Sequence, residues 1–206
     1  MRIRSAVIQD VEYMHAAGLA SMAYYYFDFR DVKKQDCYGL LSSLIFQVSA
    51  ESYSCYDILS ELYSDSSRGV RKPTISTLKK CMTDILSLPV PRKVPTYIIL
   101  DGLDECPNLP GRPSARREVL DLIEELVHLK LPNVHLCVAS RPEVDIRIVF
   151  EPLTPLEICL HDESGQKQNI IEYIKSEVHS DGNMRRWNEV GKQLVIDTLS
   201  EKADGM

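Results

Sequence analysis

The chain has 206 residues, of which 44% are hydrophobic and 26% charged, and its formal net charge is -6. These values are ordinary for a globular protein of one domain, or of one domain and part of another. A domain that binds nucleic acid usually carries a basic face, so the acidic balance argues against nucleic acid as the main partner. No window reaches the ~18 apolar residues of a membrane span. The N-terminus also lacks an apolar stretch of signal-peptide length. We therefore expect neither nucleic acid nor a membrane as a partner.

The cysteines indicate a reducing compartment, and we expect the protein to be cytoplasmic. No two of them form a C-x-x-C pair, and their spacing suggests neither a zinc site nor a disulfide framework. Two of them, Cys137 and Cys159, lie in apolar runs that are typical of strands, which predicts that they are small buried hydrophobic residues.

Helical and strand patterns alternate along the chain. An apolar stripe predicts a helix over residues 3–16 that ends near Gly18. The aromatic run 23–29 predicts a strand that is buried on both faces. Helices are also expected over 38–50, 57–63, 75–86, 114–130, 166–179 and 187–202, and strands over 96–101, 134–140 and 156–160. This alternation is typical of an α/β fold with a mostly parallel sheet and helices on both of its faces.

An acidic cluster follows the most apolar of these strands. Residues 97–100 run directly into Asp101, and Asp104 and Glu105 come soon after. Ligands of parallel α/β sheets bind at the carboxyl ends of the strands, where Mg²⁺ on a phosphate needs only one or two carboxylates. Asp101 is then the natural magnesium residue, acting through water, and Asp104 or Glu105 could orient or deprotonate the attacking water. The alternative is an acidic loop that caps the next helix or is simply solvated.

The strand over 134–140 ends in Ser140 and Arg141. We group Ser140 with Asp101 as a nucleotide-binding residue, and the Arg141 guanidinium could sense or neutralise a γ-phosphate. The alternative, which the residues alone favour, is that Arg141 pairs with a loop carboxylate. The charges that end the aromatic run, in residues 28–31, are expected to form a structural ion pair.

Four blocks of sequence, in order, resemble the NACHT domain of fungal STAND NTPases, NOD-like proteins whose domain is often labelled nephrocystin-3-like. The blocks are residues 23–31, 40–47, 98–106 and 139–142. The resemblance covers essentially the whole chain and implies a P-loop sandwich of three layers, of the ASCE type, that binds ATP or GTP with Mg²⁺. It implies that Asp101 is the Walker B magnesium residue. Asp104 and Glu105 would be the acidic pair beyond it, and Arg141 the sensor arginine.

The resemblance also implies partners and an organisation into domains. Members of the family switch between a closed resting form and an oligomeric active form, and usually carry an N-terminal effector domain and C-terminal repeats. On this basis we divide the chain into a partial NACHT domain over 1–180 and the start of a C-terminal helical segment over 181–206.

The sequence departs from the family at the phosphate-binding loop, which has the pattern G-x-x-x-x-G-K-[ST]. None of the nine glycines provides this pattern, and the nearest candidate, at 191–193, lacks the hydroxyl residue. Residues 5–10 resemble later turns of the helix that follows this loop. We therefore expect the chain to begin inside that helix, without the Walker A loop and without the strand that the family places between strands 134–140 and 156–160.

Three hypotheses follow from this departure. The chain could be part of a NACHT NTPase whose hydrolysis belongs to the complete protein. It could be an inactive member of the family that acts as an oligomerisation or regulatory module. It could also be an unrelated α/β scaffold whose acidic loop binds a cation or a partner.

Overall fold

The computed structural model describes residues 3–50, 53–66, 68–88, 94–108, 114–153 and 164–202. The chain divides into two compact units, Met1–Leu153 and Thr154–Met206. The sequence predicts a boundary between residues 180 and 181. The boundary between the compact units comes earlier, before helix α7 (Ser164–Ser180), which therefore belongs to the second unit.

The first unit is built on a parallel sheet of three strands in the order β1-β2-β3. The strands are β1 (Ser21–Tyr26), β2 (Thr96–Asp101) and β3 (Val134–Ala139). Pairing is in register along their whole length, so that Tyr26, Asp101 and Ala139 are neighbours at the carboxyl edge. The predicted α/β class and the parallel strands are confirmed. The strand predicted over 156–160 lies outside the described residues.

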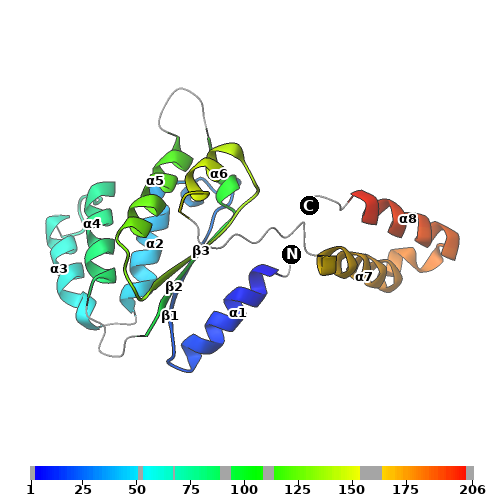
Figure 1. Ribbon diagram of the computed structural model, residues 1–206, viewed down its shortest axis with the longest axis horizontal. Helices are drawn as coiled ribbons and strands as arrows, with labels where there is room; N and C mark the ends of the chain where they lie inside the picture. Colours follow the sequence, from blue (N-terminus) through cyan, green and yellow to red (C-terminus); the bar gives the residue numbers. More distant parts are fainter. Residues whose placement is uncertain are drawn as a thin grey trace. The chain divides into compact units, whose positions relative to one another are not determined.

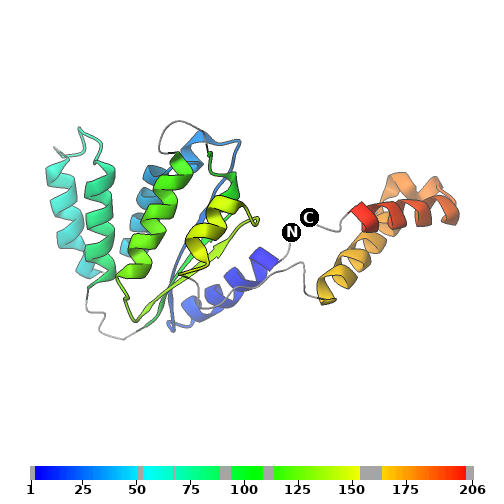
Figure 2. The same cartoon turned by 45° about the horizontal axis from the view of Figure 1, so that its top comes forward.

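Helices cover the two faces of this sheet unequally (Figures 1 and 2). One face packs against α2, α5 and α6, with α3 and α4 beside α2, whereas α1 lies on the other face. These helices are α1 (Ile3–Ala16), α2 (Cys37–Ala50), α3 (Tyr56–Asp65), α4 (Ile75–Leu86), α5 (Ala115–His128) and α6 (Val144–Phe150). The larger core lies under α2 and α5, where Ile98 and Leu100 of β2 are each 1% exposed.

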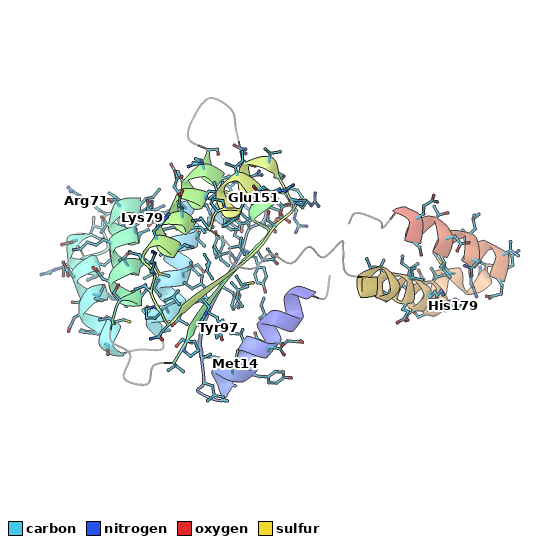
Figure 3. All side chains as sticks on the ribbon, viewed as in Figure 1. Met14, Arg71, Lys79, Tyr97, Glu151 and His179 are labelled. Carbon is cyan, nitrogen blue, oxygen red and sulfur yellow. The ribbon has the colours of Figure 1, made fainter. Side chains whose placement is uncertain are left out.

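The α1 face holds a smaller apolar cluster. Ile8 and Val11 of the helix pack on Ile99 of β2. Figure 3 shows Met14 and Tyr97 where α1 crosses the sheet, and both side chains add to this cluster. The helix therefore shields the middle of β2 and leaves other parts of the same face open.

Two predictions of burial are wrong on this open face. Tyr24 and Tyr26 of β1 are 38% and 37% exposed, whereas Tyr25, which points to the other face, is buried. Cys137 of β3, predicted to be buried, is exposed. Of the helices described in the first unit, only α1 packs on this face, and it is too narrow to cover all three strands. Cys159 lies outside the described residues.

Several local signals in the sequence produce the expected boundaries. Gly18 has a φ of 69° directly after α1, in the left-handed region that favours glycine. Ser114 caps α5, because its hydroxyl accepts a hydrogen bond from the amide of Arg117 at 3.1 Å. Helix α6 was not predicted. It has only 7 residues and exposes Val144 and Ile148, so its sequence carries no clear apolar stripe.

The outer edge of β1 is closed by a glutamine of α2. The Tyr24 amide donates to Oε1 of Gln47 at 3.0 Å, and Nε2 of Gln47 donates to the Tyr24 carbonyl at 2.8 Å. The same nitrogen also donates to the Ser43 carbonyl at 3.3 Å. The amide thus takes the place of a strand neighbour and protects this edge against pairing with another chain.

The second unit is helical where it is described. Helix α7 is followed by the 3-10 helix η4 (Gly182–Arg186) and by α8 (Glu189–Lys202), and α7 and α8 pack against each other. Val178 and Ile196 are buried there. Both helices were predicted. Within the described parts of the chain, no helix combines the length and the apolar character needed to cross a bilayer.

Gly39 lies in the first turn of α2, where the backbone before the helix and the Tyr25 side chain leave no room for a larger residue. A methyl group there would lie 2.3 Å from the Lys33 carbonyl oxygen and 2.9 Å from the Tyr25 hydroxyl. We predict that Gly39→Ala lowers the free energy of unfolding by about 1–3 kcal/mol, because the backbone before α2 must shift to make room. Urea unfolding measures the loss. Ser49→Ala in the same helix should change it by less than about 0.5 kcal/mol, and equal effects of the two variants would contradict the prediction.

Candidate functional site

The candidate site begins where β2 ends. Asp101, the last residue of the strand, is 5% exposed, and its carbonyl accepts a hydrogen bond from the Phe27 amide at 2.9 Å. Gly102 follows with a φ of 71° and a ψ of 34°, a left-handed conformation that glycine adopts without strain. Its amide donates to the Ala139 carbonyl at 3.0 Å. The chain therefore turns sharply while still bonded to β3, and enters the 3-10 helix η3 (Leu103–Glu105).

Asp104 of this turn reaches the end of β3. Its Oδ1 accepts a hydrogen bond from the Arg141 amide at 3.1 Å and lies 3.4 Å from the Ser140 hydroxyl, whose nearer acceptor is the Arg141 carbonyl at 2.9 Å. Its Oδ2 lies 3.5 Å from Nε of Arg141, in an ion pair whose aspartate side chain is 12% exposed and whose arginine side chain is 84% exposed. The fold thus joins Asp104 to Ser140 and Arg141, two predicted site residues that lie far from it in the sequence. Because the guanidinium is solvated, the ion pair itself adds little to stability.

Glu105 reaches in the opposite direction, toward the end of β1. Its Oε2 accepts a hydrogen bond from the Phe29 amide at 3.2 Å. The same loop contains the expected ion pair, with Nε of Arg30 at 3.0 Å from Oδ1 of Asp28. Hydrogen bonds from Arg30 lower the pKa of the Asp28 carboxyl below its usual value. The two acidic residues therefore do not form one cluster, because Asp104 is engaged with the β3 loop and Glu105 with the β1 loop.

Arg116 is a residue of this region that was not singled out from the sequence. It lies in the first turn of α5, is 5% exposed, and donates to the Cys106 carbonyl at 2.8 Å and to the Asp104 carbonyl at 2.6 Å. One sequence signal could have found it. Arg116 precedes Val119 and Ile123 by three and seven residues, so it lies on the apolar stripe of its helix.

The carboxylates of this region suit a magnesium ion that phosphate oxygens also hold better than a metal ion held by protein side chains alone. Among the described residues, no group of three or more histidines, cysteines and carboxylates could hold a metal ion. Magnesium on a nucleotide needs one or two carboxylates, with phosphate and water oxygens completing its shell. Asp101, at the end of β2, offers such a carboxylate. A groove of about 660 Å³ between α4 and α5, which includes Lys79 and Glu125, is lined by none of the predicted site residues.

Two cysteines of this unit, Cys106 directly after the turn and Cys37 at the start of α2, have buried thiols. The Cys106 thiol donates to the Gln35 carbonyl at 2.9 Å. Burial raises its pKa to about 12, against the opposing effect of the Arg116 charge. Burial likewise raises the pKa of Cys37 to about 11. Both thiols stay protonated at neutral pH, so neither is suited to act as a nucleophile.

The fold is that of an α/β protein whose acidic turn lies at the carboxyl edge of a parallel sheet, the edge where ligands of such sheets bind. The model of the family described as "Nephrocystin 3, N-terminal" matches residues 3–141. The chain belongs to this family. The match runs from α1 to Arg141 and includes every predicted site residue. A search of curated proteins finds no match to the chain, and a search of solved structures finds none either.

The buried thiols predict a loss of stability in alkali. In the unfolded chain they ionise near pH 9.0, whereas in the folded chain the pKa is about 11 for Cys37 and about 12 for Cys106. The stability that the protonated thiols contribute is therefore complete below pH 9 and is lost as the pH rises toward 11–12. Each thiol lowers the free energy of unfolding by up to about 1.4 kcal/mol for each pH unit in this range. Urea unfolding at about pH 8 and about pH 10.5 measures this loss.

The variant that carries both Cys37→Ser and Cys106→Ser should lose less stability over the same range of pH. A part of the loss remains in that variant, because burial also raises the pKa of Tyr25. An alkaline loss as large as in the unsubstituted protein would show that these thiols are not its source.

Proposed function

We propose that this chain forms the magnesium and water side of a nucleoside-triphosphate site, in a NACHT-type NTPase of the signal-transducing STAND class with a P-loop-like sandwich fold. The observation that carries the proposal is the contact of Asp104 with Ser140 and Arg141, beside the buried Asp101 at the end of β2. Membership of the nephrocystin 3 N-terminal family and the parallel α/β fold support it.

We assign each residue a role that its position supports. Asp101 would hold Mg²⁺ through water, and the ion would neutralise charge on the phosphates of ATP or GTP. Asp104 accepts a hydrogen bond from the Arg141 amide and lies beside the Ser140 hydroxyl, so we assign to it the orientation of these two residues. Arg141 is largely exposed and free to turn toward a γ-phosphate, for which a guanidinium is well suited.

Glu105 is the better placed of the two acidic residues to act on water. The described structure gives its carboxylate one backbone hydrogen bond, from Phe29 to Oε2, which leaves Oε1 available to accept a proton. Asp104, in contrast, uses both of its oxygens on Ser140 and Arg141. We therefore assign the water-orienting role to Glu105 and leave Asp104 the orientation of Ser140 and Arg141.

One observation favours a second candidate function, that of an inactive oligomerisation or regulatory module. The 206-residue sequence contains no G-x-x-x-x-G-K-[ST], the loop whose backbone amides and lysine hold the phosphates. In such a module the contact between Asp104 and Arg141 would be a structural link between two loops. Both functions are compatible with self-association and with attached effector or repeat domains, and the free cysteines agree with a cytoplasmic location.

We predict that the 206-residue chain by itself does not bind Mg-ATP or Mg-GTP with micromolar affinity. The reason is that the residues proposed for the site supply carboxylates and a guanidinium but no phosphate-binding loop. Isothermal titration calorimetry with each nucleotide measures this. Saturable binding in the micromolar range would show that another part of the chain holds the phosphates.

A second prediction concerns the chain joined, at its N-terminus, to the strand and glycine-rich loop of a P-loop relative. We expect this protein to bind and hydrolyse nucleotide. Glu105→Gln should lower turnover about 100-fold or more, because positioned acid–base groups contribute 10²–10⁴-fold, with a smaller change in affinity. Steady-state phosphate release measures turnover.

Asp121→Asn is the matched control, because Asp121 pairs with Arg117 on the surface of α5 and should have no effect. If Asp101→Asn and Arg141→Gln also leave binding and turnover unchanged, the assignment of the site is wrong. Self-association of the chain in sedimentation, without turnover in the joined protein, would favour the regulatory module.

A further inference from the structure

A single buried guanidinium, that of Arg116, connects the two loops that meet in the proposed site. On one side it donates to the carbonyls of Asp104 and Cys106, at 2.6 and 2.8 Å. On the other side its Nη1 forms an ion pair with Glu143 and lies 3.4 Å from Oδ1 of Asp145. The carbonyls belong to the acidic turn after β2, and the carboxylates belong to the segment after β3. The arginine comes from neither loop, but from α5.

The environment of Arg116 makes this link difficult to replace. Its side chain is 6% exposed, and a buried charge that loses its partners is strongly destabilising. A guanidinium presents five N–H donors in a planar fork and can serve acceptors on two sides at once, whereas a lysine ammonium is a point charge on a flexible stem.

The outer end of the link is itself held in place. Nδ2 of Asn108 donates to Oδ2 of Asp145 at 2.8 Å. Glu143 and Asp145 follow Arg141 closely in the chain, and Asp104 and Cys106 flank Glu105. A shift of either loop relative to the other would therefore break contacts of Arg116.

We propose that Arg116 is a positioning residue that holds the acidic turn Leu103–Glu105 in fixed register with the segment 140–145, so that Asp104 meets Ser140 and Arg141. Its side chain hydrogen-bonds the backbone of Asp104 and not its carboxylate, so it acts through the loops. The importance of this link for hydrolysis rests on the proposed function. The link itself is a property of the protein without nucleotide and can be tested on its own.

The test is amide hydrogen exchange, followed by mass spectrometry, on the full 206-residue chain without nucleotide. In Arg116→Lys and in Arg116→Met, exchange in segments 102–106 and 140–145 should rise about tenfold or more, since buried groups lose their partners. Segments in β1 and α2 serve as internal references and should change far less. Arg117→Gln is the matched control, because Arg117 is the next residue of α5 and pairs at the surface with Asp121. This control should exchange like the unsubstituted protein.

A second variant keeps the test decisive if Arg116 variants fail to fold. Glu143→Gln combined with Asp145→Asn weakens the link from its outer end, where the two side chains are 45% and 35% exposed. Exchange should then rise in segment 102–106, although both substitutions lie in segment 140–145, at the start of α6. The proposal would be overturned if the double variant kept wild-type protection in segment 102–106. It would also be overturned if Arg116→Lys exchanged like the unsubstituted protein, or if exchange rose evenly over the whole unit. Because no nucleotide is used, a failure of the proposed NTPase activity cannot be mistaken for any of these results.

Discussion

The in-register parallel pairing of β2 with both of its neighbours is the constraint on which the rest of the first unit depends. The pairing ends at Tyr26, Asp101 and Ala139, so three loops leave the sheet at the same edge. Gly102 then turns the chain in a left-handed conformation while its amide remains bonded to β3. This single turn aims the side chains of Asp104 and Glu105 at the loops on either side of β2. The polar edge is thus a consequence of strand register and of one glycine.

The two faces of the sheet differ in how far helices cover them. Gln47 closes the outer edge of β1 with a pair of amide hydrogen bonds, and helices cover most of one face, where the β3 side chains are partly buried. The other face receives α1 and leaves Tyr24, Tyr26 and Cys137 in contact with solvent. Stability therefore comes chiefly from the core under α2 and α5, because apolar burial is the dominant favourable term in folding. The candidate site lies at the carboxyl edge of this rigid core.

The family match and the geometry refer to the same part of the molecule. The nephrocystin 3 N-terminal match covers the three strands and ends at Arg141, while α7 and α8 lie beyond it in a separate compact unit. The residues that match the family model therefore all lie in the first unit. Within that unit, carboxylates, a hydroxyl and a guanidinium converge, but the residues that would cradle phosphates have no counterpart in the sequence.

The sequence alone determined the α/β class, helices with strong apolar stripes such as α5, and the strand that ends in Asp101. It also predicted that Asp101, Asp104, Ser140 and Arg141 lie at one edge, because parallel strands bring their carboxyl ends together. Tertiary structure decided that Asp104 and Glu105 diverge, that Arg116 is buried, that Cys137 is exposed, and that a seven-residue helix follows β3. Each of these features depends on contacts between residues far apart in the chain. Local periodicity and residue preference report only which face is apolar, and do not reveal which neighbour will cover it.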